Sequence, residues 1–392
     1  MRYITTGNVG EGVYKEQGSA YINDETFRKL SCTEVIPGDI LVSRLNAPIG
    51  RACIVPDLGT RVVTSVDNVI CRPVKDYFQK YIIYRFNSSD YWHELGLIAS
   101  GATMQRIGRK ELGNVRIAWP PLPEQQAIAA FLDTQTTRID ALIAEYEKLI
   151  ALLKEKRQAL ISHAVTKGLN PDVPMKDSGV EWLGEVPEGW GLRKLAWSFG
   201  LIGSGTTPPT DKIETWYSDC GTPWVTTGEL RENVILETNK SVTDEALTAI
   251  TALRKYPPGT LLVAMYGATI FRIGLLGIEA TCNQACCALV NPCGIDVKFL
   301  FHWIIAFRDT LTTLLASGGG QPNINRETVA NLKLFSPPLP EQQAIAAYLD
   351  NETAKMDALI QQAKQGIELL KERRTTLISD AVTGKIDVRE YI

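Results

Sequence analysis

The stretch Pro120-Pro-Leu-Pro-Glu-Gln-Gln-Ala-Ile-Ala-Ala-Phe-Leu-Asp133 returns later in the chain as Pro337-Pro-Leu-Pro-Glu-Gln-Gln-Ala-Ile-Ala-Ala-Tyr-Leu-Asp350, and only one of the fourteen positions differs. The match continues without a gap at an offset of 217 residues, as far as Ala164-Val-Thr166 and Ala381-Val-Thr383. A weaker match precedes it, between Tyr3-Ile-Thr-Thr-Gly7 and Trp224-Val-Thr-Thr-Gly228. A repeat at a fixed distance indicates duplicated structural units. The chain is therefore predicted to contain two copies of a globular domain, each followed by a helix.

The strongly repeated part has the pattern of a long amphipathic helix. Pro123 suits the first turn of a helix, and Glu124 lies where the helix dipole favours an acid. From there, spacings of four and three select mostly apolar positions, which is typical of a coiled-coil seam. The predicted seam residues are Ile139, Leu142, Tyr146, Leu149, Leu153 and Lys156 in the first copy and Glu352, Met356, Leu359, Ala363, Gly366 and Leu370 in the second.

Such a seam needs a partner, and the other copy is the nearest one. In an antiparallel pairing whose residue numbers sum to about 508, Glu352 lies opposite Lys156, Leu142 lies opposite Gly366 and Tyr146 lies opposite Ala363. Charge then meets opposite charge and a large side chain meets a small one. Gly366 weakens a helix by about 1 kcal/mol, so we expect it to serve close packing. The alternative, in which each helix packs only on its own domain, stays open.

The globular parts are predicted to be rich in β-strands. Short apolar runs between Gly, Pro and Asp breakers indicate strands at 40–43, 53–55, 62–64 and 69–70, and again at 261–264 and 273–276. Helices are expected at 76–86 and 297–315. The predicted fold is α+β, with two β-rich domains separated by an antiparallel two-helix coiled coil and related by an internal pseudo-two-fold repeat. The predicted domains are 1–119, 120–168, 169–336 and 337–392.

Composition favours a soluble protein without a metal centre. No stretch reaches the roughly 18 apolar residues of a membrane span, and the first twenty residues lack the apolar core of a signal peptide, so we expect a cytoplasmic protein. Four of the eight cysteines cluster without paired metal-ligand spacing, and only three histidines are present. We therefore expect no metal site, and buried reduced thiols at Cys282, Cys286, Cys287 and Cys293.

At this point the residues resemble a known family. Two divergent domains, each followed by Pro-Pro-Leu-Pro-Glu-Gln-Gln-Ala-Ile-Ala and a long helix, are similar to the specificity subunits of type I restriction–modification systems. The run Asp177-Ser-Gly-Val-Glu-Trp-Leu-Gly-Glu-Val-Pro-Glu-Gly-Trp190 resembles the entry into their second target-recognition domain. The resemblance implies two target-recognition domains that read a bipartite, asymmetric DNA site.

The resemblance also implies partners and a division of labour. Modification subunits would bind S-adenosylmethionine and methylate adenine, and restriction subunits would use ATP to translocate and cut. This chain would bind double-stranded DNA and both kinds of subunit, with no cofactor and no catalytic residue of its own. The second copy carries residues 176–222 ahead of Trp224, whereas the first copy starts at Tyr3. We therefore expect the chain to be shortened at its N-terminus relative to the family.

Base reading needs polar side chains on loops that reach the major groove. Candidates recur at matching places in the two copies, in loops punctuated by Gly. They are Thr5, Thr6, Arg44, Asn46, Gln105 and Arg106 in the first copy and Thr226, Thr227, Tyr266, Gln321 and Asn323 in the second. For any one of them, a turn residue that bonds its own backbone is the structural alternative.

The net charge of −3 shows that phosphate attraction must come from local patches or from a basic partner. Residues 1–120 hold 15 basic and 12 acidic side chains, a net of +3, whereas residues 176–336 hold 13 and 16, a net of −3.

Two other classes of protein share features of this sequence. A DNA adenine methyltransferase is suggested by Ser336-Pro337-Pro338-Leu339 and by the glycines of 200–205. Leu339, however, lacks the aromatic ring that would stack on a flipped adenine. The glycines are followed by Thr206-Thr-Pro-Pro209, which cannot readily open the helix that a cofactor loop feeds. A coiled-coil scaffold that does not bind DNA is the second alternative, and a DNA mobility assay distinguishes it.

Overall fold

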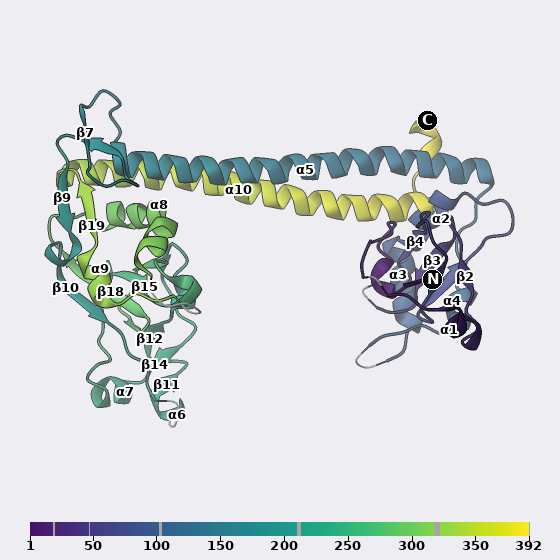
Figure 1. Cartoon of the computed structure of the whole chain (residues 1–392), viewed down its shortest axis with the longest axis horizontal. Coiled ribbons are helices and arrows are strands. Elements are labelled where there is room, and N and C mark those ends of the chain that lie inside the picture. The colour runs from purple at the N-terminus through teal and green to yellow at the C-terminus, as the bar shows by residue number, and fades with distance from the viewer. Residues whose placement is uncertain (19, 47, 102–103, 210–212, 317–321, 392) are drawn as a thin grey trace. The chain divides into compact units, whose positions relative to one another are not determined.

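The computed structural model describes residues 1–392 except 19, 47, 102–103, 210–212, 317–321 and 392 (Figure 1). It divides into two compact units, Met1–Leu149 with Gln362–Ile392 and Ile150–Gln361. The first unit contains the first globular domain and the second unit contains the second. Each unit also contains part of both long helices, so these units cut across the domain boundaries proposed from the sequence.

The first unit contains two three-stranded sheets. One has the order β1 (Arg2–Ile4), β5 (Val62–Thr64), β2 (Glu34–Val35), and the other has the order β4 (Ala52–Ile54), β3 (Ile40–Ser43), β6 (Asn68–Cys71). The short helices are α1 (Asp24–Lys29), α2 (Gln79–Phe86), α3 (Ser89–Ile98) and α4 (Arg109–Asn114). Successive residues of a strand point to opposite faces, so Ile40 and Val42 join one apolar core while Leu41 joins another. This explains why the three apolar residues of β3, Ile40 to Val42, are buried on both faces of the strand.

The second unit has a larger domain. Its main sheet has the order β10 (Phe199–Ser204), β18 (Cys286–Pro292), β15 (Leu261–Ala264), β16 (Ile273–Leu276), β13 (Asn233–Ile235). A four-stranded sheet has the order β11 (Tyr217–Ser218), β14 (Ser241–Val242), β12 (Thr222–Val225), β17 (Thr281–Cys282). Two antiparallel pairs join β19 (Lys333–Ser336) to β9 (Gly191–Lys194) and β7 (Met175–Asp177) to β8 (Glu185–Pro187). The helices are α6 (Ile213–Trp216), α7 (Asp244–Ala249), α8 (Val297–Leu315) and α9 (Arg326–Asn331).

The local elements predicted from the sequence are present. All six predicted strands form, with bounds that match to within one residue, and α8 begins and ends at the predicted residues. The helix predicted from residue 76 begins at Gln79 instead. Asp76 has a φ of 50°, a left-handed conformation that a right-handed helix does not contain.

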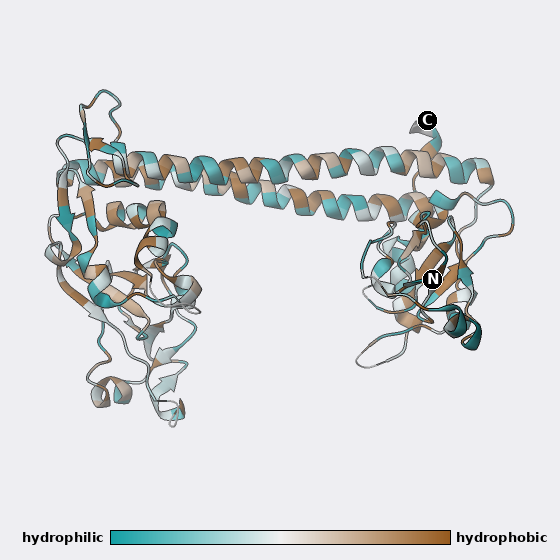
Figure 2. Ribbon diagram, viewed as in Figure 1, coloured by the Kyte–Doolittle hydropathy of each residue, from teal (hydrophilic) through white to brown (hydrophobic). Residues whose placement is uncertain are grey.

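The two long helices are α5 (Leu122–Lys167, 46 residues) and α10 (Leu339–Val382, 44 residues). In the first unit, Leu132 of α5 and Val382 of α10 share one apolar core with the domain. In the second unit, Val165 of α5 and Leu349 of α10 do the same. Figure 2 shows apolar and polar residues alternating along both helices. Each domain therefore packs on the start of the helix that follows it and on the end of the other helix.

A buried glutamine explains why the repeated motif is so constant. Oε1 of Gln125 accepts a hydrogen bond from the N–H of Phe78 at 2.8 Å, and its Nε2 donates to the carbonyls of Asp76 and Pro120 at 3.0 and 2.9 Å. In the second unit, Gln342 accepts from the N–H of Asp296 at 2.8 Å and donates to the carbonyls of Gly294 and Pro337. Each glutamine thus joins the first turn of a long helix to the segment that precedes a domain helix.

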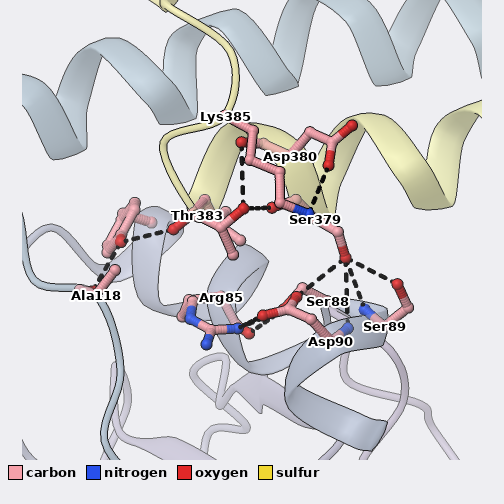
Figure 3. Close-up of polar contacts among 11 residues, drawn as sticks. Arg85, Ser88, Ser89, Asp90, Ala118, Ser379, Asp380, Thr383 and Lys385 are labelled. Carbon is pink, nitrogen blue, oxygen red and sulfur yellow. Dashed lines mark hydrogen bonds and ion pairs between the residues drawn. The ribbon is translucent and has the colours of Figure 1, made fainter.

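The last turns of α10 are fixed to the first domain by side-chain hydrogen bonds (Figure 3). Oγ of Ser379 accepts from the N–H of Ser89 at 3.1 Å and donates to Oδ1 of Asp90 at 3.0 Å. The other oxygen of Asp90 pairs with the buried guanidinium of Arg85 at 2.8 Å. The N-cap residue of α3, Ser88, makes no side-chain cap of its own. Ser379 therefore satisfies the first turn of α3 from a distant helix.

The coiled-coil seam differs from the predicted one at every second position. Ile139, Tyr146 and Leu153 lie in it as expected, and so do Met356, Ala363 and Leu370. Leu142, Leu149 and Leu359, however, are 46, 43 and 50% exposed, and Lys156 is exposed as well. The residues that follow these four, and those that follow Glu352 and Gly366, are more buried. They take the seam positions, namely Ile143, Ile150, Arg157, Thr353, Ile360 and Ile367. The seam alternates spacings of four and three as predicted, but with the opposite phase.

The pairing register also differs from the predicted one, by about six residues. Arg374 pairs with Asp140 at 3.0 Å in the first unit, and Arg157 pairs with Asp357 at 3.3 Å in the second. Both pairs sum to 514 rather than about 508, and they are exact counterparts at the offset of 217. Glu352 consequently pairs with Lys355 of its own helix rather than with Lys156. The helices do pack against one another in each unit, as the antiparallel interpretation predicted.

Gly366 serves close packing as predicted, but its neighbour is Tyr146 rather than Leu142. A Cβ atom on Gly366 would lie 3.2 Å from Cζ of the Tyr146 ring, closer than ordinary van der Waals contact. Tyr146 was expected to face Ala363, three residues earlier, and the shift of the register in this direction accounts for the difference.

Candidate nucleic-acid interface

Two polar loops lie side by side in the first unit. The loop after β3 pairs with the segment after α3 through the bridge Leu45↔Arg106. The N–H of Asn46 donates to the carbonyl of Gln105 at 3.1 Å, and Nδ2 of Asn46 donates to Oε1 of Gln105 at 3.3 Å. The N–H of Ile107 donates to the carbonyl of Arg44 at 3.1 Å. Four of the sequence-predicted residues, Arg44, Asn46, Gln105 and Arg106, are thus brought together.

The second unit builds the same pair of loops. Tyr266 and Asn323, both sequence-predicted, form the bridge that corresponds to Leu45↔Arg106. The N–H of Gly267 donates to the carbonyl of Pro322 at 2.9 Å, and the N–H of Ile324 donates to that of Met265 at 2.9 Å. These bonds match those of the first unit one for one, whereas the side chains differ. Gln321 lies outside the described residues.

The four predicted threonines lie in a second loop that recurs in both units. Two of them make hydrogen bonds within their own loop. The N–H and hydroxyl of Thr5 donate to Oδ1 of Asn8 at 2.9 and 3.2 Å. The N–H and hydroxyl of Thr226 donate to Oε2 of Glu229 at 2.6 and 3.1 Å. Both threonines thus cap the short turns that hold Thr6 and Thr227, which is the structural alternative stated for them.

Comparison with known proteins follows the same division of the chain. The family model described as "Type I restriction modification DNA specificity domain" matches residues 1–151 and again 187–369. The chain belongs to this family of type I specificity subunits.

Individual relatives agree with the family match. The chain is 26% identical over 385 residues to the "Putative type I restriction enzyme MjaX specificity subunit" of Methanocaldococcus jannaschii, a match that covers 94% of this chain and 83% of that protein. It is 22% identical over 332 residues to the "Type I restriction enzyme EcoKI specificity subunit" of Escherichia coli, covering 81% and 68%.

Two solved structures share the fold. One is a chain from a study of complex assembly and conformational transition of the type I R-M system, with a TM-score of 0.75 and 17% identity, covering 98% of this chain and 92% of that one. The other is the HsdS subunit from Thermoanaerobacter tengcongensis, with a TM-score of 0.60 and 15% identity, covering 98% and 90%. The predicted architecture, two mixed domains with a long two-helix element, is therefore confirmed.

Some basic side chains beside the paired loops of this specificity subunit hold the loops together, and others are exposed. Arg44 donates from Nε to the carbonyl of Ile107 at 2.8 Å and from Nη1 to that of Val66 at 2.9 Å, so it holds the loops together. Burial lowers the pKa of Arg44, and the neighbouring Arg106 adds to the effect. Arg106 itself pairs with Asp67 at 2.8 Å, with its side chain 46% exposed. Of the two arginines, Arg106 is the better placed to meet a ligand.

Three basic residues beside the loops were not predicted from the sequence. Arg308 of α8 donates to the carbonyls of Ala268 and Ile270, both at 3.2 Å, and so holds the loop after Tyr266. Arg109 and Arg326 are exposed at the first positions of α4 and α9, directly after the second loop of each pair. The offset of 217 relates these last two arginines, and that signal could have found them. Nothing in the local sequence marks Arg308.

The described part of the chain contains no cluster of three or more His, Cys, Asp or Glu side chains arranged to hold a metal ion. None of its helices has the length and apolar character of a membrane span. Cys282, Cys286 and Cys287 are free and buried as expected. Cys293 is free but exposed, because it follows the end of β18 rather than lying within it.

Proposed function

We propose that this specificity subunit reads a bipartite, asymmetric DNA sequence, with the paired loops of each unit on one half-site. The supporting observation is that the same loop pair recurs in both units on matching backbone hydrogen bonds, yet displays different side chains. Asn and Gln can hydrogen-bond adenine, and Arg can bond guanine, through two contacts each in the major groove. Asn46, Gln105 and Arg106 in one unit and Asn323 in the other have this chemistry.

In this proposal, the chain also binds the partner subunits and has no catalytic activity of its own. S-adenosylmethionine would bind to the modification subunits, which methylate adenine, and ATP would bind to the restriction subunits, which translocate and cut DNA. The structure of the glycine run that suggested a methyltransferase cofactor loop supports the non-catalytic assignment. Gly200 and Gly203 lie within the extended strand β10, whereas a cofactor loop needs a turn that enters a helix.

Exchange of one domain tests the proposal. Residues 176–336 would be replaced by the second domain of a relative with a different specificity, and the methylated motif would be read by methylome sequencing of cells that carry the modification partner. One half of the motif should change and the other should stay. A change in both halves, or in neither, would show that the units do not read DNA separately.

The paired helices are proposed to set the spacing of the two half-sites. Seven residues would be inserted after Ala144 and seven after Leu369, positions that the observed register places opposite each other. A heptad nearly preserves the seam phase and adds about 10 Å of helix, or about three base pairs. The non-specific spacer should lengthen accordingly, and insertion in one helix alone should disrupt folding. An unchanged spacer in a folded double-insertion protein would exclude a spacing role.

A further inference from the structure

A short turn beside the paired loops recurs in both units. It joins β5 to β6 through residues 65–67 in the first unit, and β17 to β18 through residues 283–285 in the second. The two turns are equivalent, because β1 pairs in parallel with β5 as β12 pairs with β17. Neither turn is among the segments that the sequence predicted to contact DNA.

In the first unit, backbone hydrogen bonds fix the turn between two candidate loops. The N–H of Ser65 donates to the carbonyl of Ile4 at 2.9 Å, and Ile4 directly precedes Thr5. The carbonyl of Asp67 accepts from the N–H of Arg44 at 2.8 Å. The turn therefore connects the loop of the predicted threonines to the paired loops.

The turn of the second unit makes the same connections. The N–H of Asn283 donates to the carbonyl of Val225 at 2.9 Å, and the carbonyl of Ala285 accepts from the N–H of Met265 at 2.8 Å. Val225 directly precedes the second pair of threonines, and Met265 directly precedes Tyr266. In each unit, the turn thus lies between two loops that already belong to the candidate interface.

The side chains at the tips of the two turns are exposed but differ in chemistry. Val66 is 78% exposed, and Nη1 of Arg44 holds its carbonyl at 2.9 Å. Its equivalent, Gln284, is also exposed, and its Oε1 accepts a hydrogen bond from the hydroxyl of Thr207. The same backbone therefore presents two methyl groups in one unit and a carboxamide in the other.

The next residue of each turn differs together with the paired loop. Asp67 pairs with Arg106 at 2.8 Å in the first unit. In the second unit, Ala285 and Asn323 occupy these two places, and neither is charged. The turn and the loop beside it thus differ as a set, as expected if the turn belongs to the surface that reads DNA rather than to the shared scaffold.

We propose that Val66 and Gln284 are specificity-determining residues, each contacting one base pair of its half-site; this inference rests on the proposed function. An apolar side chain can contact the C5 methyl group of thymine in the major groove, and a glutamine amide can bond N6 and N7 of adenine. An amide oxygen accepts two hydrogen bonds, so Thr207 orients the amide of Gln284 and leaves a lone pair for adenine. Val66 therefore selects thymine, and Gln284 selects adenine.

The test uses the full chain in complex with its modification partner, and the site that methylome sequencing has identified. Duplexes carry either uracil in place of one thymine, which removes only the methyl group, or 7-deazaadenine in place of one adenine, which removes only the N7 acceptor. In competition titrations, one uracil in one half-site should weaken wild-type binding about three- to fivefold. One 7-deazaadenine in the other half-site should weaken it about two- to tenfold.

Variants assign these effects to the two turns. Val66→Ala should abolish the sensitivity to uracil at one thymine, and Gln284→Ala should abolish the sensitivity to 7-deazaadenine at one adenine of the other half-site. Val74→Ala and Gln343→Ala change exposed residues of the same types outside the turns and should keep every wild-type sensitivity.

Unchanged sensitivity in Val66→Ala or Gln284→Ala would overturn the assignment of that residue. An equal loss of affinity for cognate and scrambled DNA would also overturn it, because the turn would then contact only the DNA backbone. The domain exchange described above separates this result from a failure of the proposed function. If one half of the motif follows the exchanged domain while the turn variants keep all wild-type sensitivities, only the role of the turns is lost.

Discussion

The two units share a junction with the long helices but differ in the helix that packs there. In the second unit, α8 runs unbroken through 19 residues, whereas its counterpart in the first unit is divided into α2 and α3 at Asn87 and Ser88. The break releases N–H groups at the start of α3, and Ser379 satisfies them. The counterpart of Ser379 is Ser162, whose neighbour Gln158 instead donates to the carbonyl of Ala306 in the unbroken helix. The same repeated helix thus supports two different domains through locally adapted contacts.

The two units share the polar contacts between the long helices and the domain helices. Asp133 bonds Lys80 at 2.6 Å and Tyr84 at 2.9 Å, and Asp350 bonds Lys298 at 2.6 Å and His302 at 2.9 Å. Together with Gln125 and Gln342, these contacts orient each domain on its helix. Divergence is therefore tolerated in the domains as long as the junction residues keep their partners.

The largest effect should come from the buried glutamines. Gln342→Ala leaves an N–H and two carbonyls without their partner, and each lost bond to a buried group costs about 1–3 kcal/mol. Gly294 is exposed, so water can replace one of the three bonds, and we expect the second unit to lose about 2–4 kcal/mol of unfolding free energy. Hydrogen exchange of its core strands measures this loss, and Gln125→Ala should act in the same way on the first unit. Gln343→Ala and Gln126→Ala are matched controls at exposed neighbours and should change little. Equal effects of target and control would refute the junction role.

Substitutions in the paired loops should distinguish a loss of sequence-specific binding from a loss of general DNA affinity. Arg106→Ala is expected to weaken binding to the specific site by about 1–3 kcal/mol if this side chain contacts a base edge. Gln321→Ala carries the same prediction for the other half-site. Titration of the assembled complex with cognate and scrambled DNA measures both constants. An equal loss on both DNAs would make Arg106 a phosphate contact, and no loss for either variant would remove these loops from the interface.

A smaller effect is expected at the capped helix. Ser379→Ala removes the acceptor from the first turn of α3 and the donor to Asp90, and loss of an N-cap typically costs about 1 kcal/mol. Thermal or urea unfolding should show this loss for the first unit. Ser162→Ala is the matched control at the repeat-equivalent position, where the helix is unbroken. A control variant as unstable as Ser379→Ala would show that the capping geometry is not the cause.

The smallest effect should be a pH dependence confined to the second unit. Burial lowers the pKa of His302, although Asp350 opposes the shift and Lys298 and Arg157 add to it. Burial favours a higher pKa for Asp350, but hydrogen bonds from Lys298 and His302 outweigh it and lower that pKa, so the carboxylate stays ionised near neutrality. A depressed histidine pKa means that the unfolded chain binds the proton more tightly. Stability should therefore fall as the pH drops below about 6.5, the unfolded value.

The variant His302→Gln should reduce this pH dependence when unfolding is measured between pH 7.5 and 5. The first unit provides an internal control, because burial raises the pKa of its counterpart Tyr84 to about 12, and the tyrosine stays neutral throughout. A wild-type second unit that is equally stable across this range would contradict the lowered histidine pKa.

By itself, the sequence determined the repeat, the long helices, the pairing of the two copies and the position of the core strands, because each has a local periodicity or an exact offset. It also indicated which loops correspond in the two domains. The sequence did not determine which of two adjacent residues lies in the seam, because Leu142 and Ile143, or Leu149 and Ile150, are equally apolar. Only packing of the domains and the pairs Arg374–Asp140 and Arg157–Asp357 selected one phase and register. Tertiary structure likewise decided that Thr5 and Thr226 cap turns and that Arg44 supports a loop, because a polar side chain bonds to whichever partner the fold brings within reach.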